Sequence, residues 1–366
     1  MTSSYSHFSY TWRSPPHFHG RYISACRHLF RGISKCAHWS RYAIGTLFST
    51  ISSCVAIIFF VVPSAAIARV SSSALRRRFG LLRGANMERK TLLPSKKLVN
   101  KVAVITGGAR GIGAAAATLF AQNGAHVVIA DILDDLGAAL AESIEGRYVH
   151  CDVSKEADVE SAIELALRWK GQLDIMFNNA GISGPSGSIT SLDMGKVQQL
   201  LSVNIFGYLH GIKYAAAAMI KTRTNGSIIC TSSSAAIMGG LGGHAYTLSK
   251  EAINGLVRSA ACELGVHGIR VNSISPHGVP TEILVTAYRE LLRKEDMQAE
   301  DVSKIVGETG SLLRGRCATV KDVAEAALFL ASEDSGFITA HNLVLDGGYT
   351  SATSTLSFIY QSTNRE

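Results

Sequence analysis

Apolar and polar positions follow two different periods along most of the chain. From residue 101 onward, short runs rich in Val, Ile and Ala alternate with longer segments in which apolar residues recur every three or four positions. The short runs are typical of strands that are buried on both faces, and the longer segments are typical of amphipathic helices. Seven strands are predicted, at 102–105, 126–130, 147–150, 173–177, 227–230, 269–274 and 342–345. Helices are predicted near 111–122, 134–143, 156–169, 192–221, 244–265, 281–306 and 320–332.

This alternation of strands and helices predicts the fold class. A helix between successive strands is typical of an α/β protein whose parallel sheet is covered by helices on both faces. We therefore expect a single Rossmann-type doubly wound domain with a seven-stranded parallel sheet. The domain is predicted to occupy residues 98–352, leaving an N-terminal extension, 1–86, and a C-terminal tail, 353–366. No separate substrate domain is expected.

Composition agrees with a globular domain and excludes one class of partner. Hydrophobic residues make up 47% of the chain and charged residues 17%, which argues against disorder. The net charge of +8 is concentrated at one end, because residues 1–87 hold eleven of the 36 Lys and Arg residues and no Asp or Glu. The rest of the chain is mildly acidic, so no nucleic-acid partner is expected. The seven cysteines form no C-x-x-C pair and have no nearby His at metal-ligand spacing, so no metal site is predicted.

The N-terminal extension contains an uncharged run from Tyr42 to Ala68 that is long enough to span a bilayer. Three interpretations stay open. The Arg- and Ser-rich, acid-free composition resembles an organelle transit peptide, or the apolar run is a membrane anchor. In the third and preferred interpretation translation starts at Met87, just before the domain, the upstream part is not native, and the protein is cytoplasmic. A membrane is therefore a partner only if residues 42–68 are a real anchor.

A glycine-rich turn follows the first predicted strand. Gly107 permits the tight turn, Gly111 lets the backbone approach a pyrophosphate, and Gly113 allows the following helix to pack closely on the strand. The N-terminus of that helix offers N–H groups and a partial positive charge to phosphates. We expect a dinucleotide to bind here, with Ile112 also in contact.

An acid at the end of the second strand indicates which dinucleotide binds. Asp131 lies where a carboxylate accepts hydrogen bonds from the adenosine ribose and repels a 2′-phosphate, which favours NAD(H) over NADP(H). Arg110, within the glycine turn, favours the opposite choice. We give Asp131 more weight because it lies at the ribose contact itself and the adjacent Ile132 is not basic. The alternative for Asp131 is an ordinary helix N-cap.

Two further strand ends carry polar residues. Asp152 and Val153 follow the third strand and are expected to meet the adenine, and the backbone of Asn179, Ala180 and Gly181 is expected to line the ribose. The alternative is that these residues cap the turn or helix that follows.

A tyrosine and a lysine are placed to move a proton. Tyr246 and Lys250 lie four residues apart at the start of a predicted helix, on one face. The ammonium, helped by an oxidised nicotinamide, is expected to lower the pKa of Tyr246 from its usual value of about 10, so that the phenol exchanges the substrate's hydroxyl proton. Both residues are also expected to contact the cofactor.

A serine and an asparagine complete the predicted catalytic set. A hydroxyl just after the strand 227–230 can hold the substrate oxygen, but spacing does not decide among Ser232, Ser233 and Ser234. Asn204, inside the predicted helix 192–221, is expected to hold a water that supplies protons to Lys250. The alternative is an Asn on a solvated helix face.

Together these residues resemble the short-chain dehydrogenase/reductase family over residues 98–352. The matching motifs are Thr106–Gly113 (T-G-x-x-x-G-x-G), Asn178–Gly181 (N-N-A-G), Tyr246–Lys250 (Y-x-x-x-K), the Ser233 and Asn204 positions, and Asp346–Gly348. The resemblance selects Ser233 as the catalytic serine. Within the family, stretches at 150–157, 239–244 and 347–352 are similar to a plant branch that contains secoisolariciresinol and xanthoxin dehydrogenases and a tapetum-expressed member.

The chain departs from the family after the sixth strand, where Pro-Gly is usual and Pro276-His277 is found. The resemblance implies that Val279 and Thr281 still contact the nicotinamide amide. Whether His277 faces the substrate or is a surface loop residue stays open.

The resemblance implies an NAD-dependent oxidoreductase of plant secondary metabolism that interconverts a secondary alcohol and a ketone. It also implies a homotetramer assembled through helices 192–221 and 244–265. An apolar pocket is expected, with Gly239, Leu241, Ile283 and Leu284 near its rim, for a small ring-bearing substrate. Two alternatives stay open: a cofactor-binding regulatory member without turnover, and a membrane-anchored lipid or ketoacyl reductase.

Overall fold

The computed structural model describes residues 96–353 and 355. The apolar run 42–68, Met87 and most of the C-terminal tail lie outside the described residues, so the structure bears on none of the three interpretations of the N-terminal extension. Among the residues that are described, no helix is both long and apolar enough to cross a membrane.

Seven parallel strands form one sheet, as predicted. The strands are β1 (Val102–Thr106), β2 (His126–Asp131), β3 (Arg147–His150), β4 (Ile175–Asn178), β5 (Ser227–Thr231), β6 (Arg270–Pro276) and β7 (Asn342–Leu345), in the order β3-β2-β1-β4-β5-β6-β7. The chain moves outward from β1 in one direction and then from β4 in the other. In open parallel sheets the crevice at this reversal, at the carboxyl ends of the strands, is where ligands bind.

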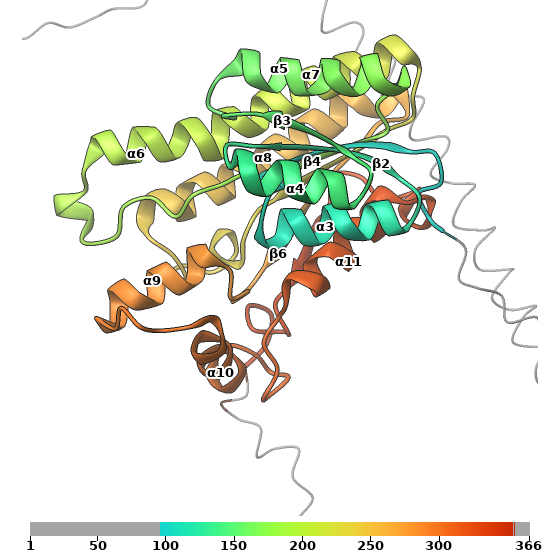
Figure 1. The fold of residues 1–366 in the computed structure, drawn as a ribbon. Helices are drawn as coiled ribbons and strands as arrows, with labels where there is room; N and C mark the ends of the chain where they lie inside the picture. Colours follow the sequence, from blue (N-terminus) through green and yellow to red (C-terminus); the bar gives the residue numbers. More distant parts are fainter. Residues whose placement is uncertain (1–95, 354, 356–366) are drawn as a thin grey trace, which may run out of the picture. The chain divides into compact units, whose positions relative to one another are not determined.

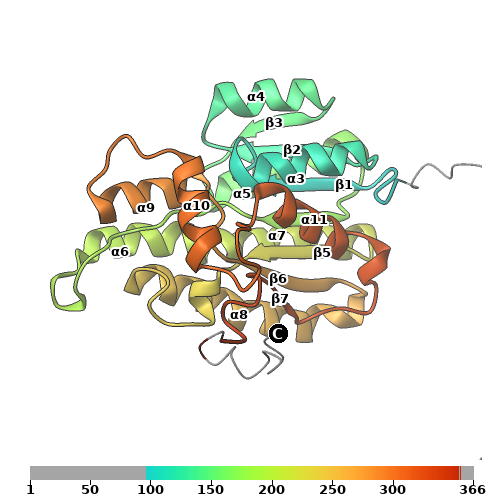
Figure 2. The same ribbon diagram turned by 90° about the horizontal axis from the view of Figure 1, so that it is seen from below.

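Helices cover both faces of the sheet (Figure 1). They are α3 (Gly111–Gln122), α4 (Asp134–Ser143), α5 (Glu156–Lys170), α6 (Met194–Leu201), α7 (Gly207–Thr222), α8 (His244–Leu264), α9 (Glu282–Leu292), α10 (Ala299–Thr309) and α11 (Val320–Ala331). Figure 2 shows α6, α9 and α10 beyond the carboxyl end of β5, on the side where the crevice lies.

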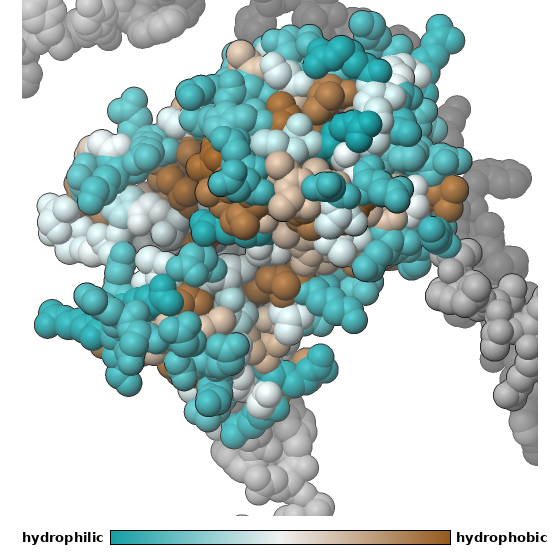
Figure 3. Space-filling view, in the orientation of Figure 1, coloured by the Kyte–Doolittle hydropathy of each residue, from teal (hydrophilic) through white to brown (hydrophobic). Residues whose placement is uncertain are grey.

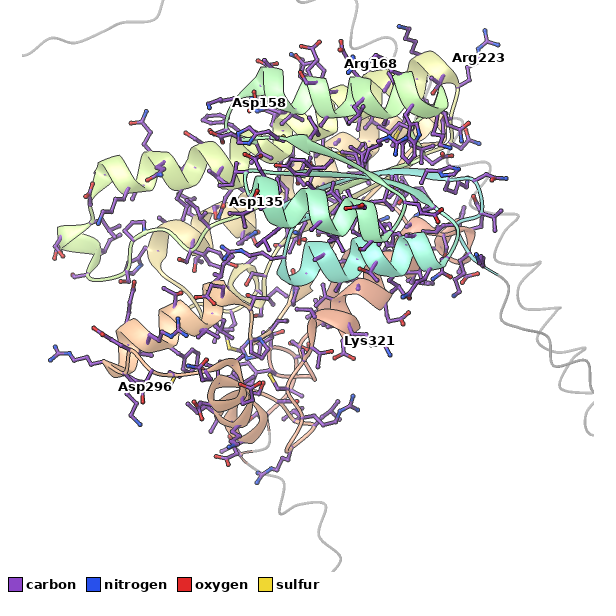
Figure 4. All side chains as sticks on the ribbon, in the orientation of Figure 1. Asp135, Asp158, Arg168, Arg223, Asp296 and Lys321 are labelled. Carbon is purple, nitrogen blue, oxygen red and sulfur yellow. The ribbon has the colours of Figure 1, made fainter. Side chains whose placement is uncertain are left out.

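Alternate residues of the buried strands feed two hydrophobic cores. Val102 and Val104 of β1 pack with α5, α7 and α8, whereas Ala103 and Ile105 pack with α3 and α11. Successive side chains of a strand point to opposite faces, and all four are buried because helices cover both faces of the sheet. Arg168 of α5, labelled in Figure 4, points away from the sheet. The Rossmann-type doubly wound domain predicted from the sequence is therefore confirmed.

Two predicted helices are wrong in detail. The segment predicted as one helix at 281–306 is two helices, because Arg293 adopts a left-handed conformation (φ 54°) that ends α9, and a capping box between Gln298 and Asp301 starts α10. The helix predicted at 192–221 is interrupted by a π-helical turn at Ser202–Phe206.

Candidate active site

Two glycines of the turn between β1 and α3 have no room for a side chain. Gly107 has φ +62°, and a Cβ added to it would lie 2.8 Å from the Cα of Ala180. A Cβ on Gly113 would lie 2.0 Å from the carbonyl oxygen of Gly107, so glycine is required where the helix meets the turn. Gly111 also has positive φ, +59°. Gly107 and Gly113 have the turn and packing roles predicted for them, whereas the approach of the Gly111 backbone to a pyrophosphate stays a prediction.

The N-terminus of α3 suits an anionic ligand. No side chain caps it: Arg110, at the N-cap position, is exposed and makes no side-chain hydrogen bond there, and no acidic residue lies in the first turn. The first N–H groups of the helix and its partial positive charge therefore face the crevice without a competing carboxylate. This donor set fits the pyrophosphate of a dinucleotide.

The Asn178–Gly181 motif ties the glycine turn to the neighbouring strands. The Asn179 side-chain amide donates to the carbonyl oxygens of Thr106 (3.2 Å) and Gly107 (3.1 Å), and its oxygen accepts from the Thr231 hydroxyl (3.2 Å). The Thr106 hydroxyl oxygen accepts from the backbone N–H groups of Asn179 (3.0 Å) and Ala180 (3.2 Å). The motif thus joins the ends of β1, β4 and β5.

Asp131 braces the glycine turn from β2. One carboxylate oxygen accepts from the backbone N–H of Ala109 (2.9 Å) and the other from that of Leu133 (3.0 Å), and the side chain is buried. The N-cap position of α4 is Leu133, so the interpretation of Asp131 as the helix N-cap is wrong. Each carboxylate oxygen keeps capacity for a further donor. The neighbouring Ile132 is exposed.

A polar cluster next to Asp131 was not predicted from the sequence. The Tyr148 hydroxyl lies 2.8 Å from the backbone oxygen of Asp131 and 2.5 Å from a carboxylate oxygen of Asp134, and His150 Nδ1 lies 2.8 Å from that same Asp134 oxygen. Burial and the hydrogen bond to Asp134 raise the pKa of Tyr148, so its hydroxyl stays a donor. The cluster holds the end of β2 in place.

Asp152 is engaged in its own turn. One carboxylate oxygen accepts from both the backbone N–H (3.1 Å) and the hydroxyl (2.7 Å) of Ser154. Burial raises the pKa of Asp152, but the bonds from Ser154 and the charge of Lys155 outweigh it and the net shift is downward. In the protein without a bound cofactor, the Asp152 side chain therefore caps its own turn, which is the alternative given for it above. Val153 is buried, and its carbonyl oxygen lies 3.0 Å from His210 Nδ1.

Lys250 is buried beneath Tyr246 in the first turns of α8. Its ammonium donates to the carbonyl oxygen of Thr231 (2.8 Å) and lies 3.5 Å from the Tyr208 hydroxyl oxygen. The Nζ atom is 5.6 Å from the centroid of the Tyr246 ring. Burial lowers the pKa of Lys250 to about 7, with the nearby Cys230 opposing the shift.

The pKa of Tyr246 shifts in the opposite direction to the one expected from its spacing to Lys250. Burial raises the pKa of the phenol, and a hydrogen bond with the Ser233 side chain offsets only part of that rise. In the protein alone the phenol is therefore the stable form.

The three consecutive serines have three different partners. Ser232 donates to the backbone oxygen of Lys250 (2.9 Å), and Ser234 lies 2.8 Å from Nδ1 of His277. Ser233 accepts from the backbone N–H of Ala235 (3.1 Å), and its hydroxyl lies close enough to the Tyr246 phenol to lower the pKa of that group. Spacing left the choice among them open, whereas the fold brings only Ser233 of the three to the phenol.

Asn204 lies in the π-helical turn and is completely buried, so the solvated-face alternative is wrong. Its side chain accepts from the backbone N–H of Ile182 (2.9 Å) and donates to the backbone oxygen of Ile182 (2.9 Å) and to the Ser249 hydroxyl (3.1 Å). Ser249 in turn donates to the backbone oxygen of Tyr246 (2.7 Å). Ile182 and Ser249 were missed because no local pattern marks them as partners of Asn204.

The segment after β6 approaches the glycine turn. Val279 is buried, and a Cβ added to Gly111 would lie 3.6 Å from Cγ2 of Thr281. His277 is half-buried and is not a surface loop residue, because its ring packs against Ser234 and Tyr349.

The predicted rim of the substrate pocket is apolar. Leu241 and Leu284 are half-buried, Ile283 is exposed, and no atom lies within 4 Å of a Cβ added to Gly239. Ile237 is also exposed. In the view of Figure 3 most outer helix surfaces are hydrophilic, and hydrophobic residues are exposed in patches beside α6.

Comparison with known proteins agrees with this site. A family model described as Enoyl-(Acyl carrier protein) reductase matches residues 107–350. The chain is 68% identical over 266 residues to Short-chain dehydrogenase reductase ATA1 of Arabidopsis thaliana, covering 72% of this chain and 98% of that relative. It is 45% identical to Sex determination protein tasselseed-2 of Zea mays, covering 70% of this chain and 83% of that relative.

Two solved structures share the fold. Levodione reductase superposes with a TM-score of 0.64 at 27% identity, covering 70% of this chain and all (100%) of that one. The aldohexose dehydrogenase of Thermoplasma acidophilum gives a TM-score of 0.63 at 31% identity, covering 70% of this chain and 96% of that one.

The Rossmann-type sheet and the site at its carboxyl edge define an oxidoreductase that acts on small-molecule alcohols or ketones, and this fold implies a nicotinamide cofactor. The chain belongs to the short-chain dehydrogenase/reductase family, among its plant members.

Proposed function

We propose that this enzyme is an NAD(H)-dependent oxidoreductase that interconverts a secondary alcohol and a ketone on a small, apolar, ring-bearing substrate, with Tyr246 as general acid/base. The observation that carries the proposal is the convergence of Tyr246, Ser233, Lys250 and Asn204 at the carboxyl edge of the sheet. The proposed catalytic domain is residues 98–352.

The chemistry that a bound nicotinamide cofactor supplies is hydride transfer to or from the carbinol carbon. Tyr246 gives its phenolic proton to the substrate oxygen in ketone reduction and removes the hydroxyl proton in alcohol oxidation. Ser233, already hydrogen-bonded to the phenol, donates to the same substrate oxygen as charge develops there. Because burial raises the pKa of Tyr246, the residue is poised as an acid until positive charge near the ring favours the phenolate.

Lys250 and Asn204 act behind the tyrosine. The Lys250 ammonium supplies positive charge beneath the phenol ring and is proposed to hold the cofactor ribose. Asn204 fixes Ile182 and, through Ser249, the backbone of Tyr246, so it positions the tyrosine and is proposed to support a water-mediated proton path to Lys250.

The preference for NAD(H) rests on Asp131. Its buried carboxylate is held at the end of β2 by two backbone donors and lies where a 2′-phosphate would meet a negative charge. Arg110 is exposed in the glycine turn and is the residue that opposes this preference. The proposed cofactor contacts are Gly107, Arg110, Gly111, Ile112, Gly113, Asp131, Ile132, Asp152, Val153, Asn179, Ala180, Gly181, Tyr246, Lys250, Val279 and Thr281.

We propose a homotetramer that assembles through α7 and α8, and a cytoplasmic location. The apolar residues Phe206, Leu209 and Leu248, on or next to these helices, are exposed in the single chain, which supports an interface there. Light scattering of the purified protein tests the assembly, and fractionation of cells that express tagged full-length protein tests the location.

The test of the proposed function is cofactor binding followed by turnover. NADH and NADPH are titrated into the full-length protein by fluorescence, and cyclic secondary alcohols are screened with the preferred cofactor. Tyr246→Phe should still bind NADH measurably and should abolish turnover, whereas Tyr214→Phe, which removes an exposed phenol on α7, should leave turnover unchanged. Turnover that survives Tyr246→Phe would refute the assigned acid/base.

Cofactor choice has its own test. Asp131→Asn should weaken NADH binding and raise the relative affinity for NADPH by about tenfold, because the repulsive charge is removed. Tighter binding of NADPH than NADH by the wild type would show that Arg110 outweighs Asp131.

A further inference from the structure

His277 occupies the position after Pro276 where the family usually has glycine, and its side chain contacts two other segments. It follows β6, and its backbone N–H donates to the carbonyl oxygen of Leu345 (3.0 Å), which continues the pairing of β6 with β7. Its Nδ1 atom lies 2.8 Å from the Ser234 hydroxyl oxygen, and its ring stacks on Tyr349 with centroids 4.5 Å apart and planes 10° from parallel. The imidazole of His277 therefore joins the serine segment, residues 232–234 after β5, to the segment after β7.

The turn that carries Tyr349, on which the imidazole stacks, is itself held in place by hydrogen bonds. The Asp346 carboxylate accepts from the backbone N–H groups of Gly348 (2.8 Å) and Thr350 (2.8 Å) and from the Thr350 hydroxyl (2.6 Å). Tyr349 lies inside this closed turn, so its ring presents a defined surface to His277. The Nε2 atom faces Gly310, where an added Cβ would lie 3.1 Å away, and the ring also lines a cavity shared with Val306 and Leu345.

The position of Ser233 depends on its neighbours on both sides. Ser232 is fixed to α8 through the backbone oxygen of Lys250, and Ser234 is fixed only through His277 among its side-chain hydrogen bonds. Ser233 lies between these two anchors and makes the hydrogen bond with Tyr246. The Ser233 hydroxyl oxygen also accepts from the backbone N–H of Ala235 (3.1 Å), in the 3-10 turn that starts at Ser234, so a displacement of Ser234 would move the donor that orients Ser233.

We propose that His277 is a positioning residue that sets the Ser233 hydroxyl against Tyr246 by holding Ser234 to the segment after β7. This inference rests on the role proposed above for Ser233. Burial lowers the pKa of His277, with Asp346 opposing the shift, which keeps the ring neutral and able to bond a hydroxyl at Nδ1.

The test separates the hydrogen bond from the stacking. His277→Phe keeps an aromatic ring on Tyr349 and removes Nδ1; it should lower kcat by about tenfold and leave the NADH dissociation constant unchanged. His277→Asn restores a hydrogen-bonding atom near the position of Nδ1 and should recover most of kcat. Ser234→Ala should match His277→Phe, and the double variant should be no slower than either, because both remove one bond.

A second readout does not depend on turnover. In protein labelled with ¹⁵N-histidine, the Nδ1 resonance of His277 should shift in Ser234→Ala and stay fixed in Ser188→Ala, which removes an exposed hydroxyl elsewhere.

Additive losses in the double variant, an unchanged kcat in His277→Phe, or a Nδ1 resonance indifferent to Ser234 would each overturn the proposal. Tyr246→Phe is assayed alongside. Turnover that survives in that variant would count against the proposed function itself, whereas loss of turnover there with normal kcat in His277→Phe would count against His277 alone.

Discussion

The buried ammonium of Lys250 makes the stability of the cofactor-free protein depend on pH. Its pKa is about 7 in the folded protein because of burial, against about 10.4 in an unfolded chain. Between these values the unfolded state binds more protons than the folded state, so the free energy of unfolding rises with pH. Below about pH 7 both states carry the proton, and the cost of burying the charge is present in full.

The size of the effect follows from the shift. Each pH unit inside the window adds about 1.4 kcal/mol for one proton, and because Lys250 is half titrated near pH 7, the gain from about pH 7 to about pH 9 is about 2 kcal/mol. The buried thiols of Cys151 and Cys230 act in the other direction, since burial raises their pKa values to about 12 and their contribution is lost once unfolded thiols ionise. A comparison of variants at equal pH cancels that background.

Urea unfolding of the cofactor-free protein, followed by circular dichroism, measures the effect. The difference in unfolding free energy between wild type and Lys250→Met should change by about 2 kcal/mol over this range, in favour of the wild type at the higher pH. Lys221→Met, which removes an exposed lysine of α7, serves as the matched control and should give a constant difference. If the Lys250→Met difference is also constant, the ammonium stays charged in the folded protein and the argument from burial fails.

Two further predictions concern the scaffold. Gly113→Ala should lower the unfolding free energy measured in urea by about 3 kcal/mol, because the new Cβ meets the Gly107 carbonyl oxygen. It should also abolish measurable NADH binding. Gly265→Ala is the control, because no atom lies within 4 Å of the added Cβ, and it should change the unfolding free energy by no more than about 0.5 kcal/mol. In the capping box of α11, the hydrogen bonds from Thr319 lower the pKa of Asp322. Asp322→Ala should therefore lower the unfolding free energy by about 1 kcal/mol near neutral pH, and this loss should disappear as the pH falls below the pKa of Asp322. An equal loss of unfolding free energy in acid would contradict the role of the cap.

Features set by local sequence were predictable. The glycine turn, Tyr246 with Lys250, and the strand-helix alternation depend on residues a few positions apart, and the structure has them where the pattern placed them. The parallel sheet with helices on both faces followed from this alternation, whereas the order of the strands was not predicted and comes from the structure.

Features set by distant partners were not predictable. The bonds of Asn204 reach Ile182 and Ser249, which lie 22 and 45 positions away. Asp152 looked like a ligand contact because of its strand end, yet its nearest donors belong to Ser154 in its own turn. The rise in the pKa of Tyr246 in the protein without cofactor was not predictable either, because spacing reveals a neighbouring charge but not burial.

The segment that carries α9 and α10 packs around a small hydrophobic cluster of its own, formed by Val285, Met297, Val302 and Val306, apart from the two cores that hold the sheet. Substitutions within this segment can therefore be accommodated without repacking the two cores that hold the sheet. If the proposed function holds, replacing residues 282–309 by the corresponding segment of a plant relative should change substrate preference and leave the unfolding free energy of the domain nearly unchanged.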